Sequence, residues 1–331
     1  MSLAMTYPAR FAPDRGIMRR ILDVILHVGA HRTGTTSLQQ TLRRNASRLR
    51  ASSVAVWEPN VTRAALFDGL VKAADRVTPQ VAAQARVSSA RVRGEIDRLR
   101  GTGMRTLIVS EENMLGAIPA CVASGQLYPD AARRMARFRP AFGAQCTRIG
   151  LAIRNYERHW TSMLGFTVKH GGRVPDRDRL GALVDQPRRW RDVIRELQVV
   201  FPRAELVVWP FEALVDVPHL LVPGLTRRVL PAPLEPVPCI HNASPDVALL
   251  RKVVAEGPCP HHLARLPEAG PWRPFSAAQI ARMRAAYDDE IAWLRSGAAG
   301  AVTYIESPEC IAGLTGPERG VDHDERQRRV G

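Results

Sequence analysis

The feature that most constrains the fold is an apolar run, Ile21–Val28, that ends at a glycine and gives way at once to a helical pattern. Such a run of aliphatic and β-branched residues is typical of a strand buried on both faces of a parallel sheet. The segment that follows, Gly29–Ser37, contains two glycines and four hydroxyl side chains. A glycine-rich turn that leads into a helix N-terminus presents backbone N–H groups to an anion. The segment therefore predicts an anion-binding loop in an α/β fold.

Further apolar runs alternate with helical patterns along the chain. They predict strands at Thr106–Ser110, Arg148–Arg154 and Glu205–Trp209, and a weaker strand at Ser53–Trp57. Strands that alternate with helices form a parallel sheet, because each crossover places a helix on one face. The sequence thus predicts an α/β fold with a parallel sheet flanked by helices on both faces.

Apolar residues at helical spacing predict three of the helices. One stripe follows the glycine loop, a second precedes the strand at Glu205–Trp209, and a third follows the capping-box pair Ser276 and Gln279. The stripes consist of Leu38, Leu42, Ala46 and Leu49; of Trp190, Val193, Ile194 and Leu197; and of Ile280, Met283, Tyr287, Ile291 and Leu294.

We expect one α/β domain over residues 18–315. Residues 1–17 are predicted to be a flexible extension, residues 316–331 a disordered tail, and the proline-rich stretch 231–238 a loop within the domain. No apolar run approaches the ~20 residues that span a bilayer, and the N-terminus lacks the apolar core of a secretion signal. The five cysteines are scattered, which favours reduced thiols. These features predict a cytoplasmic protein without an integral membrane segment.

The formal net charge of +15 does not by itself indicate a nucleic-acid partner. Only three of the 47 basic residues are lysines, and the arginines are spread along the chain without a basic block. The positive field still attracts anionic ligands of other kinds. We therefore expect no nucleic-acid partner, and the sequence does not indicate an oligomeric state.

The glycine loop has the spacing of a phosphate-binding loop, Gly29-x-x-x-x-Gly34, between a strand and a helix. A loop that binds ATP has a lysine directly after the second glycine, where this chain has Thr35. The cation of this loop is Arg32, two positions before that glycine. The pattern therefore counts against an ATP-dependent kinase, and a tight turn without a ligand is the structural alternative.

This loop resembles that of the sulfotransferases, and in particular that of the bacterial sulfotransferase-like proteins that use 3′-phosphoadenosine-5′-phosphosulfate (PAPS). Their loop has a basic residue, a threonine, a glycine and two threonines before the helix. The family's lysine is Arg32 here, and an arginine keeps the charge but cannot donate a proton. The resemblance implies that the 5′-phosphosulfate is bound by Arg32, Thr33, Gly34, Thr35, Thr36 and Ser37.

The resemblance also implies a second anion site for the 3′-phosphate of PAPS. The family has an arginine at a strand end and a serine eight residues later, and the segment GLAIRNYERHWTSML supplies Arg154 and Ser162. An arginine at a strand end can bind a phosphate through two N–H groups. The alternative interpretation is a surface arginine and a serine on a helix face. The family's C-terminal nucleotide loop has no clear counterpart, because Arg251-Lys252 lacks the following glycine.

Sulfuryl transfer needs a base that accepts the proton of the acceptor. Glu112 is the first candidate, because it follows a core strand in a Ser-x-Glu-Asn run that resembles bacterial relatives. His31, Glu111 and Glu58 are the other candidates, and Glu112 could instead cap a helix or pair with an arginine. The transferred group carries a single negative charge, so we expect no metal, in contrast to phosphoryl transfer. Cys259, His261 and His262 are accordingly interpreted as structural.

These features together predict a PAPS-dependent sulfotransferase with Arg32, Glu112 and His31 as catalytic residues. The expected acceptor is a hydroxyl or amine group on a small molecule or glycan. Two alternatives stay open: an atypical phosphotransferase with a phosphate-binding loop, and a nucleotide-binding sensor that has lost catalysis. The departure at Arg32 is the feature that supports the second alternative.

Overall fold

The computed structural model describes residues 22–237, 245–300 and 302–315. The predicted extension at 1–17 and the predicted tail at 316–331 lie outside these residues. The predicted loop is described from residue 231 to residue 237, where the chain forms neither helix nor strand.

The described residues contain a sheet of six strands in the order β2-β3-β1-β4-β5-β6, and every neighbouring pair is parallel. The predicted strands are all present. A further short strand at one edge, β6, was missed because it is three half-buried residues long. The strands are β1 (Asp23–His27), β2 (Val54–Trp57), β3 (Thr106–Ser110), β4 (Cys146–Ile153), β5 (Glu205–Pro210) and β6 (Val302–Tyr304).

Successive side chains of the central strands enter two different hydrophobic cores. In β1, Val24 and Leu26 belong to one core and Ile25 belongs to the other. In β3, Leu107 and Ile108 divide in the same way. This alternation follows from the two-residue period of a strand, and it requires helices on both faces of the sheet. The predicted α/β architecture with a flanked parallel sheet is confirmed.

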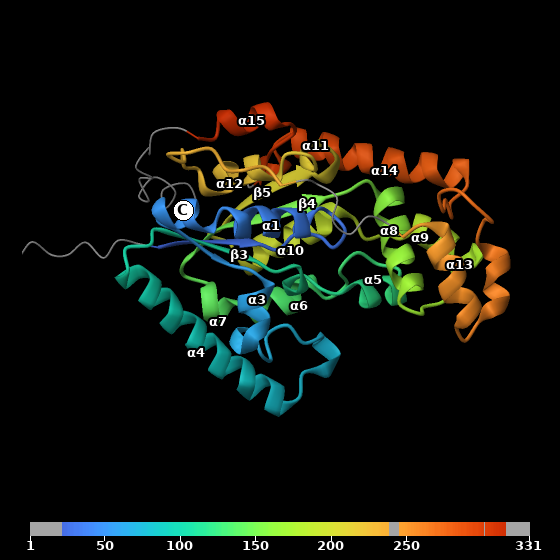
Figure 1. The fold of residues 1–331 in the computed structure, drawn as a ribbon, viewed down its shortest axis with the longest axis horizontal. Helices are drawn as coiled ribbons and strands as arrows, with labels where there is room; N and C mark the ends of the chain where they lie inside the picture. The colour runs from blue at the N-terminus through green and yellow to red at the C-terminus, as the bar shows by residue number, and fades with distance from the viewer. Residues whose placement is uncertain (1–21, 238–244, 301, 316–331) are drawn as a thin grey trace, which may run out of the picture.

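The larger core lies on the face that Val24 and Leu26 share. Figure 1 shows α4 (Pro79–Gly101) and α7 (Arg139–Phe142) below the strands, on the opposite side from α12 (Pro218–Thr226) and α15 (Pro308–Ala312). The helices that contribute buried residues to the larger core are α4 (Pro79–Gly101), α5 (Ile118–Ser124), α6 (Ala131–Ala136), α7 (Arg139–Phe142), α8 (Tyr156–Lys169), α9 (Arg177–Val184), α10 (Trp190–Val200), α13 (Val247–Glu256) and α14 (Ala277–Arg295).

The smaller core lies on the opposite face of the sheet, around Ile25 and Ile108. It is covered by α1 (Thr35–Arg44), α2 (Ala46–Ala51), α11 (Phe211–Leu214), α12 (Pro218–Thr226) and α15 (Pro308–Ala312).

The helix predictions are confirmed with one correction. Trp190, Val193, Ile194 and Leu197 are all buried on α10, and Ser276 and Gln279 form the predicted capping box of α14.

The correction concerns the stripe that follows the glycine loop. The helix breaks at Asn45, whose side-chain amide donates to the carbonyls of Thr41 and Glu235. The break rotates the next turn, so Ala46 is exposed while Leu49 stays buried. The prediction of one continuous apolar face through Ala46 was therefore wrong.

The central position of β1 places the glycine loop between the ends of β3 and β4. In an open parallel sheet the carboxyl ends of the strands share one edge, and ligands bind there. The segments after β1, β3 and β4 contain the predicted site residues, except for the base candidate Glu58, which follows β2. Among the described residues, no helix combines the length and the apolar character that crossing a bilayer requires.

Candidate functional site

The glycine loop has a backbone that depends on its two glycines. Gly29 has φ 29°, Gly34 has φ 77° and Arg32, unusually for a residue with a side chain, has φ 66°. A Cβ atom on Gly29 would lie 2.4 Å from Oγ1 of Thr35, and one on Gly34 would lie 3.2 Å from the ring of Phe211. Both positions therefore exclude a side chain, because the φ values and the close neighbours each disfavour one.

The loop leads directly into the N-terminus of α1. Gly34 is the N-cap residue, so no side chain caps the helix, and no acidic residue lies in its first turn. An uncapped N-terminus with its partial positive charge is a suitable binding position for an anion. Hydrogen bonds within the loop stabilise its conformation. The hydroxyl of Thr33 donates to the carbonyl of Ala30 at 2.5 Å, and that of Thr35 contacts the same oxygen at 3.4 Å.

The predicted second anion site lies directly against the loop. Nε of Arg32 donates to Oγ of Ser162 at 2.8 Å, and Nη1 of Arg154 donates to the backbone oxygen of Arg32 at 2.6 Å. The guanidinium groups of Arg32 and Arg154 also lie over the rings of Phe166 and Phe211, at 5.9 and 4.6 Å from the ring centres. The structure therefore brings together the residues that the two sequence motifs predicted.

Arg32 and Arg154 form no ion pair within the described part of the chain. Burial lowers the pKa of Arg154 to about 10; the more distant Glu212 opposes this shift and the charge of Arg32 adds to it. Burial also lowers the pKa of Arg32. Nε of Arg154 is buried and has no hydrogen-bond partner among the described residues. The site thus holds two partly desolvated positive charges that a bound anion would stabilise.

His31 is held inside the loop by Tyr128, a residue that the sequence did not single out. The backbone N–H of His31 donates to the hydroxyl of Tyr128 at 2.6 Å, and Nδ1 lies 3.2 Å from the same oxygen. Nε2 lies 3.4 Å from Oδ1 of Asn113. Burial lowers the pKa of His31, although the charge of Glu112 opposes this. The imidazole is therefore neutral at pH 7 and can accept a proton.

The two adjacent glutamates after β3 have different environments. Glu111 is fully buried, and its carboxylate accepts hydrogen bonds from the hydroxyl of Thr62 at 2.7 Å and from two N–H groups of Arg63. It also accepts from the backbone N–H of Asn113 and so caps the short helix Glu112–Met114. A carboxylate with this many partners has a structural role, which makes Glu111 the poorer base.

Glu112 lies at the surface of the site, with 21% of its side chain exposed. Its carboxylate accepts from Arg63 at 2.9 Å and from the side chain of Gln39 on α1 at 3.1 Å. Burial acts to raise the pKa of Glu112, but its backbone hydrogen bond and the charge of Arg63 lower it overall. Glu112 is therefore an ionised carboxylate beside α1, the helix that follows the glycine loop. Its contact with Arg63 also makes it an arginine partner, as the alternative interpretation expected.

Glu58 is placed away from the glycine loop. Its carboxylate makes a two-point contact with Arg43, at 2.7 Å to Nε and 2.6 Å to Nη2. Arg43 lies in the last turn of α1, roughly 12 Å from Thr35 at the rise of an α-helix. Among the base candidates, Glu112 and His31 are therefore the two that the structure places beside the loop.

His159 is a buried residue of the site that sequence reasoning missed. Its ring is fully buried against Trp190, with 5.1 Å between ring centres, and neither ring nitrogen has a hydrogen-bond partner among the described residues. Burial and the positive charges of Arg154 and Arg32 lower its pKa. The available signal was spacing, because His159 precedes Ser162 by three positions and so shares its face of α8.

A cavity of about 660 Å³ lies beside α8. Thr161 and Gly165 line it from α8, Trp272 lines it from a later loop, and Asp246 and Glu268 add two carboxylates. Thr161 and Gly165 directly precede Ser162 and Phe166, the two residues that contact Arg32. The cavity is mainly apolar, and its volume lies within the range of small-molecule sites.

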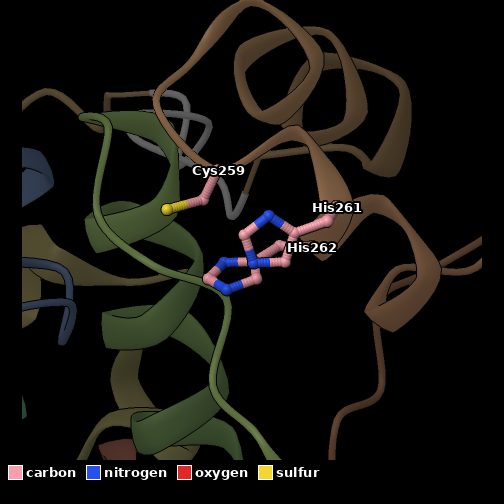
Figure 2. Close-up of side chains that lie close together, drawn as sticks. All are labelled: Cys259, His261 and His262. Carbon is pink, nitrogen blue, oxygen red and sulfur yellow. The ribbon is translucent and has the colours of Figure 1, made fainter.

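Two groups of residues from the C-terminal part of the chain remain: Arg251, and Cys259 with His261 and His262. Arg251 donates to the backbone oxygens of Leu266 and Pro267, so it supports a neighbouring segment. Cys259, His261 and His262 come together in one group, which Figure 2 shows.

His27 at the end of β1 makes stability depend on pH. Its Nδ1 lies 2.8 Å from the hydroxyl of Ser110, and burial, opposed by the charge of Glu112, lowers its pKa from 6.5 to about 4. The unfolded chain therefore binds a proton below pH 6.5 that the folded protein takes up only near pH 4. Stability is complete above this window and falls as the pH drops through it, and we expect a loss of about 2 kcal/mol at about pH 5 from this residue.

Urea unfolding at about pH 7.5 and about pH 5 measures this effect. His27→Asn is the matched variant, because it keeps a polar partner for Ser110 and removes the titrating group. It should show a smaller loss between the two pH values than the wild type. An identical pH dependence in both proteins would assign the loss to other groups.

Comparison of the chain with protein-family models, with curated proteins and with solved structures finds no match in any of the three.

Proposed function

We propose that this chain is a PAPS-dependent sulfotransferase that moves a sulfuryl group to a hydroxyl or amine acceptor. The observation that supports this most strongly is the pair of guanidinium groups, Arg32 and Arg154, that lie without an ion-pair partner among the described residues beside the uncapped N-terminus of α1. Two adjacent anion positions fit a nucleotide with phosphates at both the 5′ and 3′ positions. The absence of a lysine after Gly34 argues against ATP.

In this proposal the loop and the start of α1 bind the 5′-phosphosulfate. Arg154 and Ser162 bind the 3′-phosphate, and the guanidinium of Arg32 stabilises the charge that develops on the bridging oxygen. Because arginine does not donate its proton, Arg32 acts here through its charge. The leaving group is then the 3′,5′-bisphosphate, released in its ionised form.

Glu112 is the proposed base, with His31 as the alternative. As the acceptor oxygen or nitrogen attacks the sulfur atom, the bond between sulfur and the bridging oxygen breaks and Glu112 accepts the acceptor's proton. We place the acceptor in the cavity beside α8, whose residues directly precede the Arg32 contacts. A small molecule or one end of a glycan fits this volume.

A second candidate function is nucleotide binding without transfer. The observation in its favour is the contact between Arg32 and Ser162, which directs the loop cation toward the second anion site. A sensor of this kind would bind the bisphosphate and the donor alike and would turn over neither.

Calorimetric titration distinguishes the proposed nucleotide from ATP. We expect adenosine 3′,5′-bisphosphate to bind much more tightly than ATP. It should do so without magnesium, because the guanidinium groups of Arg32 and Arg154 take the place of a metal ion. ATP binding that is equal or stronger and requires magnesium would support the phosphotransferase alternative. Donor binding without transfer to any acceptor would support the sensor.

Arg154→Ala is the variant that tests the second anion site, and Arg86→Ala is its control. It should weaken binding of the bisphosphate by about 2–3 kcal/mol, the value of a charge-assisted contact, and leave adenosine 5′-monophosphate nearly unaffected. Arg86→Ala, on the exposed side of α4, removes one positive charge elsewhere and should change neither affinity. Equal weakening of both nucleotides by Arg154→Ala would show that Arg154 supports the loop through its bond to Arg32 instead.

A further inference from the structure

Three side chains that can bind a transition metal converge outside the candidate transfer site. The sulfur of Cys259 and ring nitrogens of His261 and His262 all lie within 4.8 Å of one another. Figure 2 shows the two imidazole rings close together, with the thiol on the same side of the chain. Four-coordinate zinc has bonds of ~2.0–2.3 Å to such donors, so their ligand atoms need to approach within a few ångströms of one another.

The local sequence explains why these side chains converge. Pro258 and Pro260 flank Cys259, and each proline restricts the φ angle of its position. Cys259 is the N-cap of the 3₁₀ helix η4 (Pro260–Arg265), and the backbone N–H of His262 donates to the carbonyl of Cys259 at 3.0 Å. A 3₁₀ helix has three residues per turn, so Cys259 and His262 share one face. His261 is the next position around the helix.

The group is supported on one side and open on the other. The helix η4 packs against α13, His262 is only 6% exposed, and Cys259 is half-buried. His261 is exposed, so a metal ion could enter from that side. The two rings meet edge to face, with 4.5 Å between their centres.

The donor chemistry selects the class of metal. One thiolate and two imidazoles are borderline-soft ligands that favour zinc, whereas magnesium and calcium require oxygen ligands. The guanidinium of Arg265, at the end of η4, is bound to the backbone oxygen of Val174, 2.8 Å away.

We propose that Cys259, His261 and His262 bind one zinc ion as a three-ligand site whose fourth position is open to water or to a further ligand. The ion would link the turn at Cys259 to η4 and thereby stabilise the packing of η4 on α13. A zinc site here replaces the structural interpretation of these residues, and it is independent of the proposed transfer reaction, which requires no metal.

Cobalt titration of the metal-free, reduced full-length protein tests this site. Bound Co²⁺ should give the intense visible bands of a tetrahedral ion and a thiolate-to-metal band in the near ultraviolet, at one ion per chain, and Zn²⁺ should displace it. Cys259→Ser should abolish the thiolate band. His261→Ala should weaken Co²⁺ binding by at least about 100-fold, since even residues behind the ligands contribute 10–100-fold. Because His261 is exposed, its replacement by alanine should not disturb folding.

Cys310→Ser is the matched control, because Cys310 is an exposed free cysteine outside the group. It should keep both the spectrum and the affinity of the wild type. Absence of tetrahedral bands in the wild-type protein would overturn the proposal, as would a thiolate band that survives in Cys259→Ser or binding that is unchanged in His261→Ala.

Discussion

Replacing Glu112 with glutamine is expected to lower sulfuryl transfer to an alcohol acceptor by roughly 10²–10⁴-fold, the usual contribution of a positioned base. Glutamine keeps the size of the side chain, and its carbonyl oxygen can still accept from Gln39 or Arg63. The variant loses the negative charge beside Arg63 and, with it, the ability to accept the acceptor's proton. Donor affinity, measured with the bisphosphate, should stay near the wild-type value.

His31→Asn is the comparison that identifies the base. Asparagine can keep a contact with the hydroxyl of Tyr128, and the backbone bond from His31 does not depend on the side chain. Normal transfer in Glu112→Gln together with a large loss in His31→Asn would assign the base to His31. Large losses in both variants would indicate that the two groups act together. Where no acceptor is available, hydrolysis of the donor can be measured in place of transfer.

Replacing the neighbouring Glu111 with alanine is expected to lower the free energy of unfolding by about 3 kcal/mol. This is the lower end of the range for breaking a buried ion pair, because Arg63 is about half exposed and water can solvate its charge. The loss also leaves the N–H of Asn113 without its acceptor, and the buried hydroxyl of Thr62 keeps only its longer contact with the backbone oxygen of Glu58. Urea unfolding measures the difference.

Glu112→Gln is the matched control for stability, since it alters the adjacent residue and the same arginine. Its free energy of unfolding should lie within about 1 kcal/mol of the wild type, as for most partly exposed substitutions. If Glu111→Ala does not fold, Glu111→Gln keeps the volume and should show a smaller loss in the same direction. Wild-type stability in Glu111→Gln would contradict a structural role for this carboxylate.

The sequence alone determined the order of the main elements and the position of the glycine loop. Strand and helix periods are local properties, so β1, β3, β4 and β5 could be predicted from apolar runs of a few residues. The turn chemistry of Gly29 and Gly34 is also local, because a positive φ angle favours glycine whatever surrounds it.

The resemblance to the sulfotransferases also paired Arg154 with Ser162, at the family's spacing within one strand–helix unit. It could not show that Arg32 reaches this serine, since that contact joins residues 130 positions apart. The helix break at Asn45 escaped prediction for a similar reason. The amide of Asn45 bonds to the backbone at Glu235, a residue from a distant part of the chain.

Only the tertiary structure decided which of two identical neighbours is buried. Glu111 and Glu112 have the same chemistry, but Glu111 still has an extended backbone after β3 whereas Glu112 begins a 3₁₀ helix. Of the two, only Glu111 contacts Thr62 in the core. Their shared partner, Arg63, is one of 47 basic residues and carries no signal of its own. Local periodicity determines which elements form, whereas the partners of charged side chains depend on packing between distant segments. That packing places Glu112 beside the glycine loop and buries Glu111.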